Sequence, residues 1–227
     1  MKGILLPFLF WTLFFASNLA AQQRDSLVSI VAVPAKMGLL YIGVDNPISI
    51  YATGIPYDSL DVTISNGTIS KLENDWYIAR VAKGGEASIK ISSKDNSHSV
   101  IFKYGVLRIP DPMPVLGGKY LSGDTLSVGV FKHQPGIIMK TDNFNFDIKC
   151  NTVGYSVIKV GASEEDGRKS VEILKNTGAK FNPDVLELIN EATPGDIFIF
   201  NEIKARCPGD EKERKLNSLI FFMDDND

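Results

Sequence analysis

The sequence predicts a mainly β protein built from two immunoglobulin-like β-sandwich domains in tandem, the second carrying one α-helix. Residues 27–109 form short runs of alternating apolar and polar residues, each ended by turn residues, as in such sandwiches. The stretch Ile109–Pro114 then contains three prolines, which exclude a helix or a central strand. A single clear helical pattern follows at residues 182–192.

The first 21 residues predict a secretory signal peptide. Lys2 precedes the apolar run Ile4–Ala16, and small and polar residues follow as far as Ala21. We expect cleavage after Ala21, export, and no membrane span in the mature chain. An uncleaved membrane anchor is the less favoured alternative, because the strictly apolar part is shorter than the ~20 residues of a spanning helix.

The overall charge is too small to predict a highly charged partner. The formal net charge is −3, and loss of Lys2 with the signal segment makes it −4. This balance argues against nucleic acid or an anionic membrane surface as partner. The partner is expected to be a protein or a glycan.

The first domain is expected to span residues 26–108. Turn residues separate its expected strands, and the clearest hairpin is centred on Asn66-Gly67, where a type I′ turn would join two β-branched runs. The expected strands are Leu27–Val33, Leu39–Ile42, Ile48–Tyr51, the two arms of the hairpin within Val62–Ser70, Trp76–Val81, Ala87–Ser92 and Ser99–Leu107.

The prolines at residues 109–114 predict a stiff joint, formed by Ile109, Pro110, Asp111 and Pro112, that leads into a second domain at residues 115–224. The helix at 182–192 has Asn182 as N-cap and Pro183 at its first position. The other elements expected in this domain are strands at Leu126–Phe131, Gly136–Met139, Phe144–Cys150, Val153–Val160, Asp196–Ala205 and Leu216–Met223, with a charged hairpin tip at Ser163–Arg168.

Cys150 and Cys207 are the only cysteines, and export would allow a disulfide between them to persist. The sequence does not show whether their Cα atoms come within bridging distance. The alternative is a pair of small buried apolar side chains. We slightly favour that alternative, because each cysteine lies in a strand-like run that would be stable without a bridge.

No catalytic, metal or cofactor site is predicted. The two histidines, His98 and His133, have no cysteine, histidine or paired carboxylate at ligand spacing. The Gly117-Gly118-Lys119 turn lacks the first glycine of a phosphate loop, and Tyr120 stands in place of its hydroxyl residue. We therefore expect a binding or structural protein with no cofactor.

Several segments resemble the third and fourth domains of GldM, the periplasmic shaft protein of the gliding-motility and type IX secretion apparatus of Bacteroidota. The first domain is similar in Leu40–Ile50, Ile64–Thr68 and the joint Ile109–Pro112. The second is similar in Leu116–Lys119, Phe144–Asp147, the capped helix from Phe181, Pro194–Asp196, Ile203–Ala205 and Arg214–Leu216.

This resemblance implies β-rich interaction modules in the periplasm, homodimerisation, and contact with outer-membrane ring components. The chain departs from the family in two ways. It lacks the helical bundle before the third domain and a carboxylate in its amino-terminal apolar run, so we expect no motor function. Cys207 and the stretch Pro208–Glu213 also replace what looks like a compact turn.

The favoured hypothesis is a non-enzymatic accessory or paralogue in type IX secretion or gliding motility that binds envelope proteins. The alternative is a free-standing immunoglobulin-like adhesin or glycan-binding module, for which the adjacent pair Trp76 and Tyr77 would begin an aromatic platform. An enzyme comes third, and would need His98 or His133 to find carboxylate partners in space.

Overall fold

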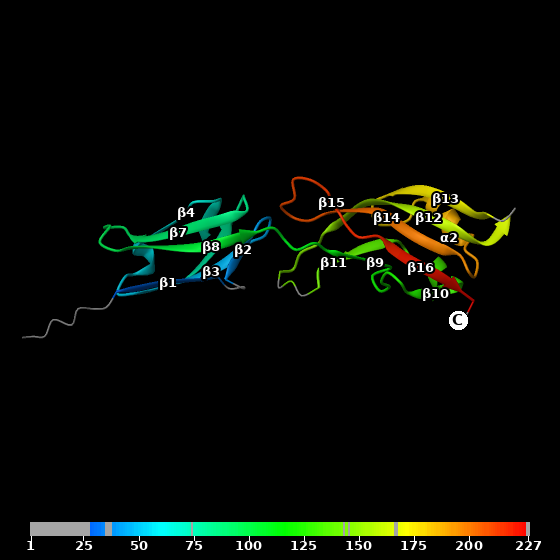
Figure 1. Cartoon of the computed structure of the whole chain (residues 1–227). Coiled ribbons are helices and arrows are strands. Elements are labelled where there is room, and N and C mark those ends of the chain that lie inside the picture. The colour runs from blue at the N-terminus through cyan, green and yellow to red at the C-terminus, as the bar shows by residue number, and fades with distance from the viewer. Residues whose placement is uncertain are drawn as a thin grey trace, which may run out of the picture.

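The computed structural model describes residues 28–34, 38–73, 75–142, 144, 146–165 and 168–225. Two β-rich domains lie end to end, and a short irregular segment joins the last strand of the first to the opening strand of the second (Figure 1). The predicted mainly β, tandem-sandwich fold class is confirmed. The expected signal segment lies outside the described residues.

The first domain is a sandwich of two four-stranded sheets, ordered β1-β3-β6-β5 and β2-β8-β7-β4. Alternation along each strand directs one set of side chains into a core that includes Leu40, Ile48 and Ile89, all fully buried. Its elements are β1 (Ser29–Pro34), β2 (Leu39–Tyr41), β3 (Asn46–Thr53), the 3-10 turn η1 (Tyr57–Ser59), β4 (Leu60–Ile64), β5 (Thr68–Lys71), β6 (Trp76–Arg80), β7 (Gly85–Ser93) and β8 (Ser99–Leu107).

The Asn66-Gly67 hairpin prediction is wrong, because the chain crosses there from one sheet to the other. β4 pairs with β7, whereas β5 pairs with β6. Gly67 has a φ of 105°, but Asn66 does not have the positive φ that a type I′ turn needs. The Asn66 side chain instead accepts from the Lys83 N–H at 3.1 Å and donates to the Lys83 carbonyl at 2.6 Å.

The second domain is built on a six-stranded sheet ordered β10-β16-β14-β12-β13, with β15 also paired to β14. The two-stranded sheet β9–β11 and two helices contribute to the core on one face of this sheet, together with Phe198 and Phe221. Its elements are β9 (Met113–Leu116), β10 (Thr125–Ser127), α1 (Val128–Lys132), β11 (Ile137–Lys140), β12 (Asn151–Glu165), β13 (Arg168–Thr177), α2 (Pro183–Asn190), β14 (Ile197–Arg206), β15 (Arg214–Lys215) and β16 (Leu219–Asp224).

Helix α2 forms where its caps predict. The Asn182 side chain accepts from the Val185 N–H at 2.9 Å, and Val185, Leu188 and Ile189 are buried. The strand expected at Leu126–Phe131 is wrong beyond residue 127. There the Ser127 hydroxyl accepts from the Val130 N–H and caps α1, which buries Phe131 fully.

The strand expected at Phe144–Cys150 is also wrong. Within that run the described residues 144 and 146–150 have no regular structure. Phe144, Ile148 and Cys150 instead pack around Ile109 of the joint. Their apolar pattern therefore reflects burial against the joint and not a place in a sheet.

We predict that Gly67→Ala destabilises the first domain by about 3 kcal/mol. A Cβ at this position would overlap the carbonyl oxygen of Arg80 as well as straining the positive φ. Gly85→Ala is the matched control, because Gly85 has a φ of 117° but nothing within 4 Å of the added carbon, and it should cost about 1 kcal/mol.

Urea unfolding followed by Trp76 fluorescence measures both variants, since Trp76 is the only tryptophan of a chain prepared without residues 1–21. Equal losses of stability in the two variants would contradict the overlap argument.

Candidate functional site

The second domain holds the segment between the domains through contacts to the backbone of that segment. Residues 108–112 have no regular structure. Ile109 is fully buried in a cluster with Cys150, Cys207 and the partly buried Val44. The joint is therefore an anchored part of the structure and not a free linker.

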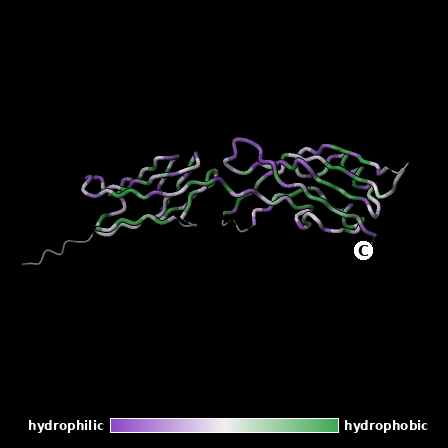
Figure 2. The backbone as a smooth tube through the Cα atoms, viewed as in Figure 1, coloured by the Kyte–Doolittle hydropathy of each residue, from purple (hydrophilic) through white to green (hydrophobic). Residues whose placement is uncertain are grey.

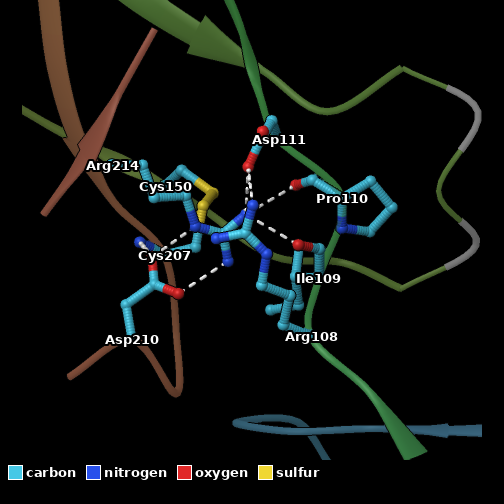
Figure 3. A network of polar contacts seen from close by, with 8 residues as sticks. All are labelled: Arg108, Ile109, Pro110, Asp111, Cys150, Cys207, Asp210 and Arg214. Atoms are coloured by element: carbon cyan, nitrogen blue, oxygen red, sulfur yellow. Dashed lines mark hydrogen bonds and ion pairs between the residues drawn. A yellow bond between two sulfur atoms is a disulfide. The ribbon is translucent and has the colours of Figure 1, made fainter. Parts of the chain in front are cut away.

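Arg214 of β15 is the centre of the polar contacts at the joint (Figure 3). One terminal nitrogen of its guanidinium donates to the carbonyl oxygens of Ile109 at 2.6 Å and Pro110 at 3.1 Å, and to the Asp111 carboxylate at 3.0 Å. Its Nε and other terminal nitrogen bind both oxygens of Asp210, at 2.7 and 2.6 Å. The planar fork thus ties the joint to the loop before β15.

Arg214 and Asp210 form a buried pair, with side-chain exposures of 4% and 7%. Burial opposes the ionisation of Asp210, but hydrogen bonds from Arg214 and from the Cys207 N–H outweigh it and lower the pKa of this carboxyl group. Burial also opposes the charge of Arg214, whereas Asp210 and Asp111 raise its pKa. Both groups are therefore charged at neutral pH.

A disulfide between Cys150 and Cys207 lies beside this pair (Figure 3). The two cysteines are 57 residues apart in sequence. The structure departs here from the slight preference for two buried thiols, because the run before Cys150 is not a strand and folds back towards the end of β14. A crosslink over a loop of this length stabilises a fold by about 4 kcal/mol.

The turn between β2 and β3 brings the first domain against the second. Asn46 is 2% exposed; it accepts from the Tyr41 N–H at 2.7 Å and donates to the Tyr41 carbonyl at 2.9 Å, which fixes the turn. Gly43 lies at its tip with a φ of 81°, where a Cβ would overlap the backbone of Pro208 and Gly209. Backbone packs directly on backbone across the domain boundary.

Aromatic contacts extend this interface. The Tyr41 ring of the first domain lies 4.8 Å from that of Phe144 and 5.5 Å from that of Phe146, both in edge-on geometry. Tyr41 is only 4% exposed as a result. It therefore packs against the second domain.

The structure brings together most residues that the sequence placed at the joint. Ile109, Pro110 and Asp111 all accept hydrogen bonds from Arg214, and Pro112 is not among the acceptors of that guanidinium. Asn66 and Gly67 lie elsewhere, within the first domain. Sequence reasoning gave no role to Arg214, which it named only within a segment similar to GldM, or to Asp210, which lies in the stretch that departs from the family. The charges of the two residues are opposite at i and i+4, in a strongly hydrophilic loop (Figure 2).

The hydrogen bonds of the two histidines involve backbone and serine groups. The backbone of His98, and not its ring, contacts Ser93 in the turn between β7 and β8. The Nδ1 of His133 lies 2.7 Å from the Gly129 carbonyl oxygen at the end of α1. Within the described part of the chain, no group of three His, Cys, Asp or Glu side chains could hold a metal ion.

The described residues include no helix with the length and apolar character that a membrane crossing requires. This finding concerns residues 28–34, 38–73, 75–142, 144, 146–165 and 168–225 alone.

Comparison with known families places each domain separately. Residues 29–105 match the GldM third domain, and residues 110–223 match the GldM C-terminal domain. The chain belongs to the GldM family. The two matches flank the joint, where Arg214 binds Ile109, Pro110, Asp111 and Asp210 in a set of contacts that we call the clamp. The two family matches indicate a module related to gliding motility and type IX secretion. No curated protein matches the chain.

Two solved structures are similar to this GldM-family chain at low identity. The fibronectin(III)-like modules of Clostridium thermocellum CbhA are 11% identical, over 86% of this chain and 94% of theirs, with a TM-score of 0.26. Three N-terminal domains of the outer capsid protein Hoc of bacteriophage RB49 are 9% identical, over 87% of this chain and 70% of theirs, with a TM-score of 0.27. Neither TM-score is high enough to bear on function.

We predict that Arg214→Ala lowers the free energy of unfolding of the second domain by about 3 kcal/mol, because it leaves Asp210 buried without its partner. Arg108→Ala is the control. Arg108 also bonds Asp111, at 2.9 Å, but its side chain is 61% exposed, so its loss should cost less than about 1 kcal/mol.

Urea unfolding followed by circular dichroism measures stability, and small-angle X-ray scattering measures the spread of interdomain distances. The spread should widen in Arg214→Ala only. A similar spread in both variants would show that the clamp does not fix the joint.

We predict that acid weakens the clamp. Since the folded-state pKa of Asp210 lies below its ordinary value, its contribution is complete above the unfolded pKa of about 3.9 and is lost as pH falls through the lower folded value. Asp210→Asn should remove this part of the pH dependence of unfolding below about pH 4. An unchanged acid profile in the variant would contradict the assignment.

Proposed function

We propose that this protein is a non-enzymatic periplasmic interaction module, an accessory or paralogue in type IX secretion or gliding motility. The observation that carries the proposal is the joint, where two GldM-type domains are held by the Arg214 contacts, the neighbouring disulfide and the Gly43 contact. The proposal includes cleavage of residues 1–21 and the homodimer that membership of the family suggests.

The physical argument concerns orientation. A flexible linker would let each domain bind independently and would transmit no torque or alignment. Here two prolines fix backbone torsions, and three carbonyl or carboxylate groups of the joint bind one buried guanidinium. A partner held by one domain would therefore have a defined orientation relative to the other domain.

The glycan-binding alternative loses its main sequence support. Trp76 is 37% exposed, but Tyr77 is 5% exposed, because neighbouring residues of a strand point to opposite faces. The pair therefore cannot form one flat aromatic platform. We do not propose this function.

We expect affinity capture of the tagged full chain from the envelope of its own cells to recover secretion or gliding components. The double variant Pro110→Gly/Pro112→Gly should recover them less well, since it frees the joint while leaving Ile109 in place. Pro56→Gly/Pro194→Gly is the matched control at exposed positions away from the joint. Recovery of no such component by the unaltered chain would overturn the proposed function.

A further inference from the structure

The outer face of the large sheet in the second domain carries two apolar rows. Strands β16, β14, β12 and β13 each point one set of side chains into the core and the alternate set outwards. The inward set includes Phe221, Phe198 and Val157. Strand register aligns the outward side chains into the rows Phe222-Ile197-Val160-Val171 and Ile220-Ile199-Ile158-Ile173.

These rows are open to solvent, most of all at β13. Val171 is 58% exposed and Ile173 is 63% exposed, and Phe222 and Ile220 at the other end of the rows are 43% and 37% exposed. Ordinary strand spacing gives the patch an extent of roughly 19 Å by 14 Å. A stable interface buries about 800 Å² on each partner, so a partner that docks here needs contacts beyond this face.

The edge of β13 can supply those contacts. β13 is the last strand of the sheet and lies at the margin of the second domain (Figure 1). The Asn182 side chain donates to the Lys175 carbonyl at 2.9 Å and covers the carboxyl end of the strand. Because β13 is the last strand in the sheet order and pairs with β12, alternate N–H and C=O groups of residues 168–174 face away from the sheet.

We propose that β13 is a docking edge for an extended segment of a partner protein, which adds as a further strand and carries two apolar side chains flanked by acidic ones. Along β13 the outer face presents Lys169, Val171, Ile173 and Lys175, all exposed. An added strand with the matching period would extend both apolar rows by one residue and place its carboxylates beside the lysines.

Charge disfavours a second copy of this chain as the occupant. The antiparallel register that pairs Val171 with Ile173 of another β13 also sets Lys169 opposite Lys175 and Glu172 opposite itself. Like charges directly opposite each other destabilise a pair of strands, so the same lysines that attract an acidic segment oppose self-pairing.

The proposal rests on the proposed function only in treating the chain as a binding module, and it is tested with defined probes. The first probe is a labelled, end-capped peptide Glu-Thr-Val-Thr-Ile-Thr-Glu, and the second has lysine at both ends. Fluorescence anisotropy should show binding of the acidic peptide. Lys169→Glu/Lys175→Glu should weaken it about 10-fold and should favour the lysine peptide instead.

Two controls separate strand addition from general stickiness. Lys83→Glu/Lys90→Glu makes the same charge change at exposed positions of the first domain and should leave binding unchanged. N-methylation of alternate residues of the acidic peptide gives two blocked forms. One should lose binding and the other keep it, because only every second N–H of an added strand faces β13.

Absence of binding up to about 1 mM peptide, equal binding of the two methylated forms, or no effect of Lys169→Glu/Lys175→Glu would overturn the proposal. The Lys169→Glu/Lys175→Glu variant, used in the envelope capture, distinguishes failure of the β13 proposal from failure of the proposed function. Undiminished recovery of secretion components would reject the β13 edge and leave the proposed function standing, whereas absence of components from the unaltered chain would reject the proposed function.

Discussion

The path of the chain between the two domains depends on one guanidinium group, which holds the joint to the second domain. Proline removes a donor but leaves its carbonyl, and Ile109 is fully buried, so the joint brings acceptors into a site with little water. Arg214 satisfies the Ile109 and Pro110 carbonyls from one nitrogen and uses the other two on Asp210. No buried side-chain nitrogen or oxygen of the described residues lacks a partner.

The other contacts at the joint have complementary roles. The Cys150–Cys207 disulfide holds the irregular run after Phe144 against the end of β14, and the loop after Cys207 carries Asp210 back to Arg214. The Gly43 tip of the first domain rests on that same loop. Orientation is thus fixed close to the boundary, which leaves the outer face of the large sheet and the edge of β13 free for partners.

Much of the fold follows from local pattern, and the wrong predictions lie where contacts between residues distant in sequence decide the structure. Alternation placed most strands, and the Asn182-Pro183 cap placed α2, because these signals are local. Asn66-Gly67 was misread as a hairpin since the pair also suits a crossover in which the asparagine bonds a distant loop. The run Phe144–Cys150 was misread because apolar residues buried against the joint resemble those of a strand.

By itself, the sequence determined the β class, the break at the prolines and the family resemblance, since each depends on residues close together in the chain. Only the tertiary structure decided what holds the joint. Arg214 lies more than 100 residues after the carbonyls it binds, and Cys207 lies 57 residues after Cys150. Contacts over such separations have no local pattern, because they form only when packing brings distant backbone segments together.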